Sequence, residues 1–169
     1  MSKKGFTLAE VLVTLGVIGV VSAITMPILI QNHQKHVTEN KLKHFYSMIN
    51  QALKMGTLEN GEVEEQLGNL GYNFTYDENE KFLEKYILPY IKYLDIKPCK
   101  SEKSPACVHL ANGELFMFNI DKNGGDVLYF PNGKYTKENE RRNRFAFQFY
   151  KKSGEITYSK NLIEPYTQS

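Results

Sequence analysis

The chain has 169 residues, of which 21 are Lys or Arg and 19 are Asp or Glu, so its net charge at neutral pH is only +2. This length is enough for one modest globular domain besides a membrane helix. The even charge balance disfavours a nucleic-acid binder that depends on a strongly basic surface. The composition shows no disordered block, low-complexity block or internal repeat.

The amino-terminal stretch organises the rest of the chain. Lys3 and Lys4 precede an apolar run, Val11 to Ile30, that contains no charged residue. As a helix this run would rise ~30 Å, which is enough to cross the hydrocarbon core of a membrane. Glu10 lies just inside its leading edge, and a carboxylate there is costly unless a cation pairs with it. The run offers no such cation, so the partner must come from elsewhere.

The sequence Gly5-Phe6-Thr7-Leu8-Ala9-Glu10 follows a short basic leader, and Pro27 lies late in the apolar run. This pattern resembles the processing motif of type IV pilins and type II secretion pseudopilins. The resemblance implies that prepilin peptidase removes a leader of residues 1–5, cutting between Gly5 and Phe6, and methylates the new amino terminus on Phe6. It also implies that Glu10 pairs with the terminal amine of a neighbouring subunit, which supplies the missing cation. The strong resemblance covers residues 1 to about 35.

Two other interpretations of this stretch are open. An ordinary signal peptide could be cleaved at Val21-Ser22-Ala23, or the segment could be an anchor that is never processed. Against the signal peptide, Glu10 interrupts the apolar region, and apolar residues continue as far as Ile30.

The charges around the apolar run bear on topology. Lys3 and Lys4 favour a cytoplasmic amino end, although three more lysines soon follow the span and reduce the asymmetry: Lys35, Lys41 and Lys43. The resemblance implies a single-pass protein of the bacterial cytoplasmic membrane that becomes an extracytoplasmic or cell-surface filament after assembly.

The helical pattern continues beyond the apolar run. Apolar residues recur at three- and four-residue steps on an otherwise polar helix: Leu42, Phe45, Tyr46, Ile49, Ala52 and Leu53. We expect one helix from about Thr7 to Met55, ~73 Å long, that ends at Gly56 and is kinked at Pro27. The expected segments are a leader (1–5), a membrane and filament-core helix (6–30) and a pilin-like soluble domain (31–169) whose helical half ends near residue 56.

The rest of the chain predicts a few further elements. A short helix is expected around 63–67, and helical spacing from 80 to 94 predicts another helix that Pro89 distorts or splits. From Cys107 onward the apolar period changes to two, and Asn112-Gly113 predicts a hairpin turn. Turns are expected at 121–126 and 131–133, a surface loop at 134–144, and strands at 108–111, 114–120, 127–130, 145–150 and 155–158. The predicted fold is α+β and pilin-like, with the long helix packed on a C-terminal antiparallel sheet of about four strands.

Cys99 and Cys107 are the only cysteines in the chain. Outside the cytoplasmic membrane the pair can oxidise, and we expect a disulfide that closes a short Pro-containing loop. The alternative is a catalytic thiol, for which His109 is the one nearby base.

Possible metal ligands are sparse. His33 and His36 lie one turn apart without an accompanying carboxylate or cysteine at ligand spacing. Many pseudopilins carry an acidic Asp-x-Asn-Gly segment that helps bind calcium, but the matching Pro131-Asn132-Gly133 lacks the aspartate. Oxygen ligands precede it at Asp121, Asn123 and Asp126, without the spacing of a complete calcium loop. We expect no metal or other cofactor, with calcium as the alternative.

Two classes of function fit these observations. The first is a structural subunit of a type IV pilus or type II secretion pseudopilus, polymerised through its amino-terminal helix. Its implied partners are other pilin or pseudopilin subunits, prepilin peptidase, an inner-membrane assembly platform and membrane lipid; nucleic acid is not indicated. The second is a membrane-tethered extracytoplasmic binding domain that does not polymerise. No phosphate loop, nucleophile elbow or zinc-ligand set is present, so we expect no catalytic residues and no enzyme activity.

Overall fold

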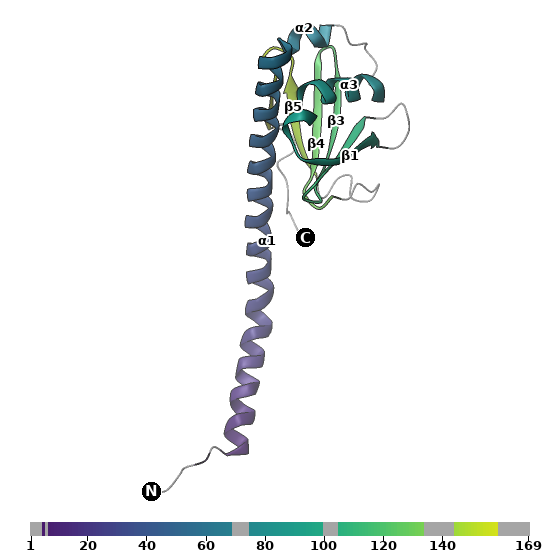
Figure 1. The fold of residues 1–169 in the computed structure, drawn as a ribbon. Helices are drawn as coiled ribbons and strands as arrows, with labels where there is room; N and C mark the ends of the chain where they lie inside the picture. Colours follow the sequence, from purple (N-terminus) through teal and green to yellow (C-terminus); the bar gives the residue numbers. More distant parts are fainter. Residues whose placement is uncertain (1–4, 6, 69–74, 100–104, 134–143, 159–169) are drawn as a thin grey trace. The chain divides into compact units, whose positions relative to one another are not determined.

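The computed structural model describes residues 5, 7–68, 75–99, 105–133 and 144–158. The chain divides into two compact units, Met1–Asn40 and Lys41–Ser169. Figure 1 labels most of the elements along the chain. The helices are α1 (Leu8–Asn60), α2 (Val63–Gly68), α3 (Tyr76–Tyr86) and the 3-10 turn η1 (Leu88–Tyr90). The strands are β1 (Tyr93–Pro98), β2 (Ala106–Leu110), β3 (Leu115–Asp121), β4 (Gly124–Phe130), β5 (Phe145–Tyr150) and β6 (Glu155–Tyr158).

The strands form one antiparallel sheet in the order β1-β2-β3-β4-β5-β6, so each strand pairs with its neighbours in sequence. The long helix and this sheet confirm the α+β, pilin-like fold, but the expected number of about four strands is wrong because the sheet has six. The short helix predicted around 63–67 is present as α2. The loop predicted at 134–144 lies outside the described residues, apart from Arg144.

The helix predicted over 80–94 is split before Pro89, as expected, but both of its ends are wrong. Helix α3 begins earlier, where the Thr75 side chain accepts a hydrogen bond from the Glu78 backbone N–H and so caps the first turn. It ends at Tyr86 because Pro89 cannot continue an α-helix. The chain passes through η1 and enters β1, so Leu94 belongs to a strand. Apolar residues on both sides of Pro89 had produced one apparent helical period.

The predicted turn at 121–126 is also too long, because strand β4 already begins at Gly124. A Cβ at Gly125 would lie 2.1 Å from the Asn119 carbonyl oxygen of β3. Glycine therefore allows two strand backbones to approach closely, and this use of glycine conceals a strand from an analysis of side-chain alternation.

Helix α1 does not end at Gly56, so that prediction is wrong. The helix continues to Asn60, and Gly61, with φ +86°, adopts the left-handed conformation that terminates many helices. Gly56 instead lies where α1 meets the end of α3: a Cβ there would be 2.5 Å from the Tyr86 carbonyl oxygen. Its missing side chain permits helix packing and has no role in ending the helix.

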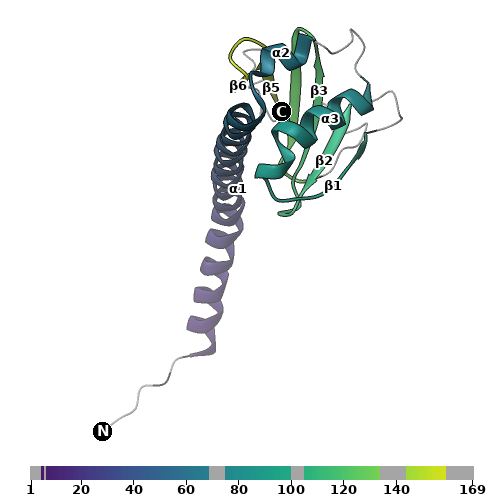
Figure 2. The same cartoon turned by 45° about the horizontal axis from the view of Figure 1, so that its top comes forward.

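The hydrophobic core lies between one face of the sheet and the helices α1 and α3. From α1, Phe45 stacks on Tyr129 of β4 with ring centroids 4.1 Å apart and also contacts Phe147 of β5. From α3, which lies over β1 to β3 (Figure 2), Phe82 stacks on Phe118. These residues are at most 3% exposed, so aromatic side chains supply much of the apolar area that holds the second unit together.

A buried polar cluster holds α1 in place at Lys41, the first residue of the second unit. The Lys41 ammonium group donates a 2.7 Å hydrogen bond to the Pro131 carbonyl and lies 3.6 Å from the Glu114 carboxylate, which is 4% exposed. Burial, and next the neighbouring Glu114 carboxylate, raises the pKa of Tyr129 well above its usual range. Removing Lys41 would leave the buried Glu114 carboxylate without a counter-ion. The contacts of Lys41 therefore fix where α1 meets the turn before β3, which contains Glu114, and the turn after β4, which contains Pro131.

Candidate assembly site at the amino-terminal helix

The first turn of α1 forms a capping box. The Thr7 hydroxyl accepts a 3.3 Å hydrogen bond from the Glu10 backbone N–H, while Glu10 Oε2 accepts 2.8 Å bonds from both the Thr7 N–H and the Thr7 hydroxyl. A threonine followed three residues later by glutamate is the sequence signature of this motif, which our sequence analysis did not use. Glu10 therefore stabilises the start of its own helix before any neighbouring subunit is considered.

The turn after the capping box begins a wholly exposed apolar segment. Every large apolar side chain from Leu8 to Ile30 is at least 43% exposed. The threonine hydroxyls of this segment bond to carbonyls of their own helix. The Thr14 hydroxyl shares its proton between the Glu10 and Val11 carbonyls, and the Thr25 hydroxyl donates to the Val21 carbonyl. By length and composition, α1 could cross a membrane. An exposed apolar helix of this kind needs lipid or protein around it.

The remaining predicted residues of this region have different outcomes. Gly5 is exposed, whereas Phe6 lies outside the described residues. Pro27 lies inside α1, which continues through it. Proline has no N–H to donate to the carbonyl four residues earlier, which is the reason to expect a kink there. The kink stays a prediction.

Comparison with known families divides the chain within the apolar run, next to Pro27. Residues 1–26 match the prokaryotic N-terminal methylation motif, and residues 28–169 match a family of unknown function, DUF6613. The chain belongs to the DUF6613 family. The methylation motif confirms the resemblance to type IV pilins and pseudopilins, and this class is structural. No curated protein and no solved structure matches this DUF6613 chain.

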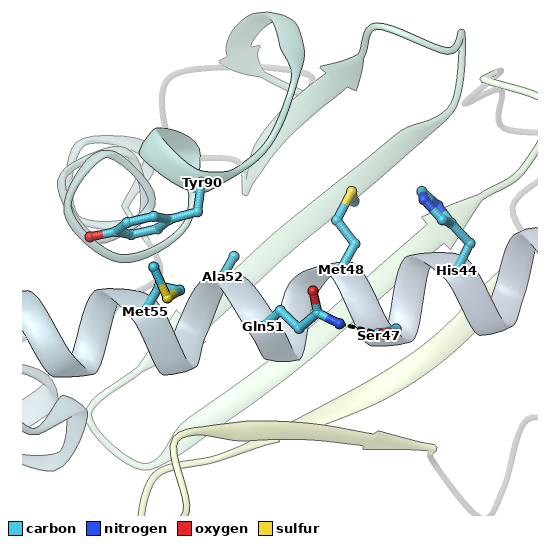
Figure 3. A pocket seen from close by; sticks show the side chains of 7 residues that line it. All are labelled: His44, Ser47, Met48, Gln51, Ala52, Met55 and Tyr90. Atoms are coloured by element: carbon cyan, nitrogen blue, oxygen red, sulfur yellow. Dashed lines mark hydrogen bonds between the residues drawn. The ribbon is translucent and has the colours of Figure 1, made fainter.

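In this DUF6613 domain, a surface groove of about 500 Å³ runs along α1. It is lined by His44, Ser47, Met48, Gln51, Ala52, Met55 and Tyr90 (Figure 3). Gln51 donates a 2.9 Å hydrogen bond to Ser47 along one side of it. The Tyr90 hydroxyl donates to Glu59, and this bond, followed by burial, raises the pKa of Tyr90. Among the lining residues, no hydrogen bond joins the Ser47 hydroxyl to His44.

The disulfide predicted between Cys99 and Cys107 is present. Cys107 is buried beside Leu115, Met117 and Phe130 on the face of the sheet opposite the helices. The nearby His109 ring contacts Asp95 on β1, so both the thiol and the base of the alternative catalytic pair are engaged.

Native protein should therefore keep both cysteines out of reach of alkylating reagents. Non-reducing peptide mapping of freshly extracted protein should find the peptides of Cys99 and Cys107 joined, because an extracytoplasmic compartment preserves disulfides. Reduction in denaturant before alkylation is the control and should release two thiols. Two alkylated cysteines in the unreduced sample would contradict both the bond and the predicted compartment.

Some of the possible metal ligands make ordinary contacts. The Asn123 backbone N–H donates a 2.7 Å hydrogen bond to the Asp121 carboxylate, which is turn chemistry within the β3–β4 hairpin. His36 lies 3.8 Å from Glu39 on the same helix. Within the part of the chain that the structure describes, no three His, Cys, Asp or Glu side chains gather around a common point. Calcium binding stays an untested alternative.

Proposed function

We propose that the chain is a subunit of a type IV pilus or of a type II secretion pseudopilus. Prepilin peptidase would cleave it after Gly5 and methylate Phe6, and it would polymerise through the exposed apolar part of α1. Its partners would be other pilin or pseudopilin subunits, an inner-membrane assembly platform and membrane lipid. Residues 6–30 would be the membrane and filament-core segment, and residues 31–169 the soluble domain outside the cytoplasmic membrane.

The observation that carries this proposal is the methylation motif followed by Glu10 and then by the exposed segment Val11 to Ile30, which has no charged residue. A neighbour's terminal amine is the cation that such a carboxylate needs in an apolar environment. Thr7 occupies only Oε2 of Glu10, and Oε1 accepts no hydrogen bond from the residues that the structure describes. One carboxylate can thus cap its own helix and still bind an amine.

The proposed cleavage is compatible with the capping box. The peptide bond between Phe6 and Thr7 is kept when the chain is cut after Gly5, so the Thr7 N–H remains an amide donor for Glu10. The new amine on Phe6 is one residue farther from the helix. Processing therefore creates a cation without removing the contacts that hold Glu10 in place.

Intact-mass measurement of membrane-derived protein tests the processing step. We expect loss of Met1 to Gly5 and one added methyl group, which fragment spectra should place on Phe6. Gly5→Leu, which changes only the residue before the cut, is the matched control and should retain the leader. Cleavage after Ala23, or an intact leader in a strain with active prepilin peptidase, would overturn the pilin assignment in favour of a signal peptide or an uncleaved anchor.

A further inference from the structure

The sheet ends at two edge strands, β1 and β6, and an open edge strand offers backbone donors and acceptors to another chain. Ile156 of β6 faces Phe149 of β5 in the register of this hairpin. Its backbone N–H and carbonyl, however, bind a side chain of α1: the N–H donates to Asn50 Oδ1 at 2.9 Å, and the carbonyl accepts from Asn50 Nδ2 at 3.2 Å. A carboxamide thus occupies the place where a seventh strand would pair.

The next residue of β6 with the same orientation, Tyr158, contacts α1 through its side chain. The Tyr46 ring of α1, one helical turn before Asn50, stacks on the Tyr158 ring with centroids 5.1 Å apart. Tyr158 lies two residues after Ile156, so its backbone groups point toward the same side of the strand. The Tyr46–Tyr158 stack places α1 beside this end of β6, and the backbone groups of Ile156 are the ones that bind an α1 side chain.

The opposite edge, β1, is covered only in part, because Tyr93 to Asp95 are exposed. The Cys99 N–H bonds to the Pro105 carbonyl, so in the alternating antiparallel pattern Ile96 and Pro98 direct their backbone groups away from β2. Pro98 has no N–H to offer. The Tyr76 hydroxyl lies 3.4 Å from the Ile96 carbonyl while donating a shorter, 2.6 Å bond to Glu80. Its single proton makes it a cover for this carbonyl more than a full hydrogen-bond donor.

A second asparagine side chain takes the place of a strand partner inside the sheet. The register of β2 with β3 ends at Phe118, and Ile120 lies beyond it. The buried Asn79 of α3 accepts the Ile120 backbone N–H at 3.0 Å and donates to the Thr75 carbonyl. Asparagine side chains from the helices thus complete hydrogen bonding at strand positions that lack a strand partner.

We propose that Asn50 closes the β6 edge to strand addition by a second copy of this chain. The backbone bonds of Ile156 with Asn50 are those that another β6 would make, so the two pairings exclude each other. This inference does not depend on the proposed filament, because it concerns only the second unit.

The test compares full-length Asn50→Ala with Asn60→Ala in detergent. Asn60 also lies on α1 and donates to two backbone carbonyls, of Gly56 and Lys85, but contacts no edge strand. Peptide-resolved amide hydrogen exchange over β6 and light scattering are measured across a range of protein concentration. In dilute Asn50→Ala, β6 exchange should rise on the order of tenfold. At higher concentration the particle mass should increase and the β6 protection should return.

Asn60→Ala should keep wild-type β6 exchange and mass. Unchanged β6 exchange in Asn50→Ala, or a particle mass that never exceeds that of Asn60→Ala, would overturn the proposal. If Asn50→Ala also loses protection in β3, Asn50→Ser decides by the same two readouts, because its hydroxyl preserves more of the local packing.

Discussion

Filaments should fail to form from Glu10→Gln protein, although the chain is made, inserted and processed at wild-type levels. The substitution keeps the size of the side chain and removes its charge, so a neighbour's amine would enter the apolar filament core without a counter-ion. Breaking a buried ion pair by removing one partner costs about 3–5 kcal/mol. That corresponds to a more than ~100-fold loss in association for each contact.

The rest of the molecule should tolerate this change. The glutamine side-chain oxygen can still accept the Thr7 N–H, so the first turn of α1 should remain capped. The contacts of the second unit begin at Lys41, far along the helix from this site. Insertion should be as good or better, since a neutral amide is less costly in lipid than a carboxylate.

Shearing cells and weighing the released filaments against the membrane-bound pool measures the Glu10→Gln effect. Glu39→Gln is the matched control, because it makes the same substitution on an exposed, polar stretch of α1, and it should polymerise normally. Glu10→Gln filaments at wild-type yield would show that Glu10 is a tolerated charge. The membrane-tethered, non-polymerising domain would then be the better assignment.

The second large effect is expected from Gly56→Ala. A new Cβ would lie 2.5, 2.7 and 2.9 Å from the carbonyl oxygen, Cα and carbonyl carbon of Tyr86, and these backbone atoms cannot rotate away as a side chain could. Overpacking of this kind costs ~1–3 kcal/mol and sometimes more. Alanine gains up to ~1 kcal/mol in helix propensity, which offsets only part. Because the clash is with backbone atoms, we take the upper end of the overpacking range, ~3 kcal/mol, and expect a net loss of about 2 kcal/mol in the free energy of unfolding.

Urea unfolding followed by the near-ultraviolet signal of the buried tyrosines would measure the Gly56→Ala effect. Gly68→Ala is the control: it also adds one methyl group to a helical glycine, but no atom lies within 4 Å of the new Cβ. Its stability should be equal to that of wild type or slightly higher. If Gly56→Ala were as stable as Gly68→Ala, α1 and α3 would not be in backbone contact at Gly56.

The amino-terminal part of the chain was predictable because its information is local. Charge, apolar length and the Gly5-to-Glu10 motif lie within one short segment, and the family comparison confirms the methylation motif itself. The capping box between Thr7 and Glu10 was readable in the same way, since its two members are three residues apart. The disulfide followed from there being only two cysteines.

The tertiary structure decided what depends on partners distant in sequence. Gly56 looked like a helix stop, but its meaning depends on Tyr86, thirty residues later, which comes close enough to forbid a side chain. No local sequence pattern singles out Asn50, and only the position of β6 gives it two backbone bonds. A residue's type and spacing specify its own conformational preference. Which groups it meets across the fold is settled by packing, because the same glycine or asparagine suits a turn, a helix end or a close contact equally well.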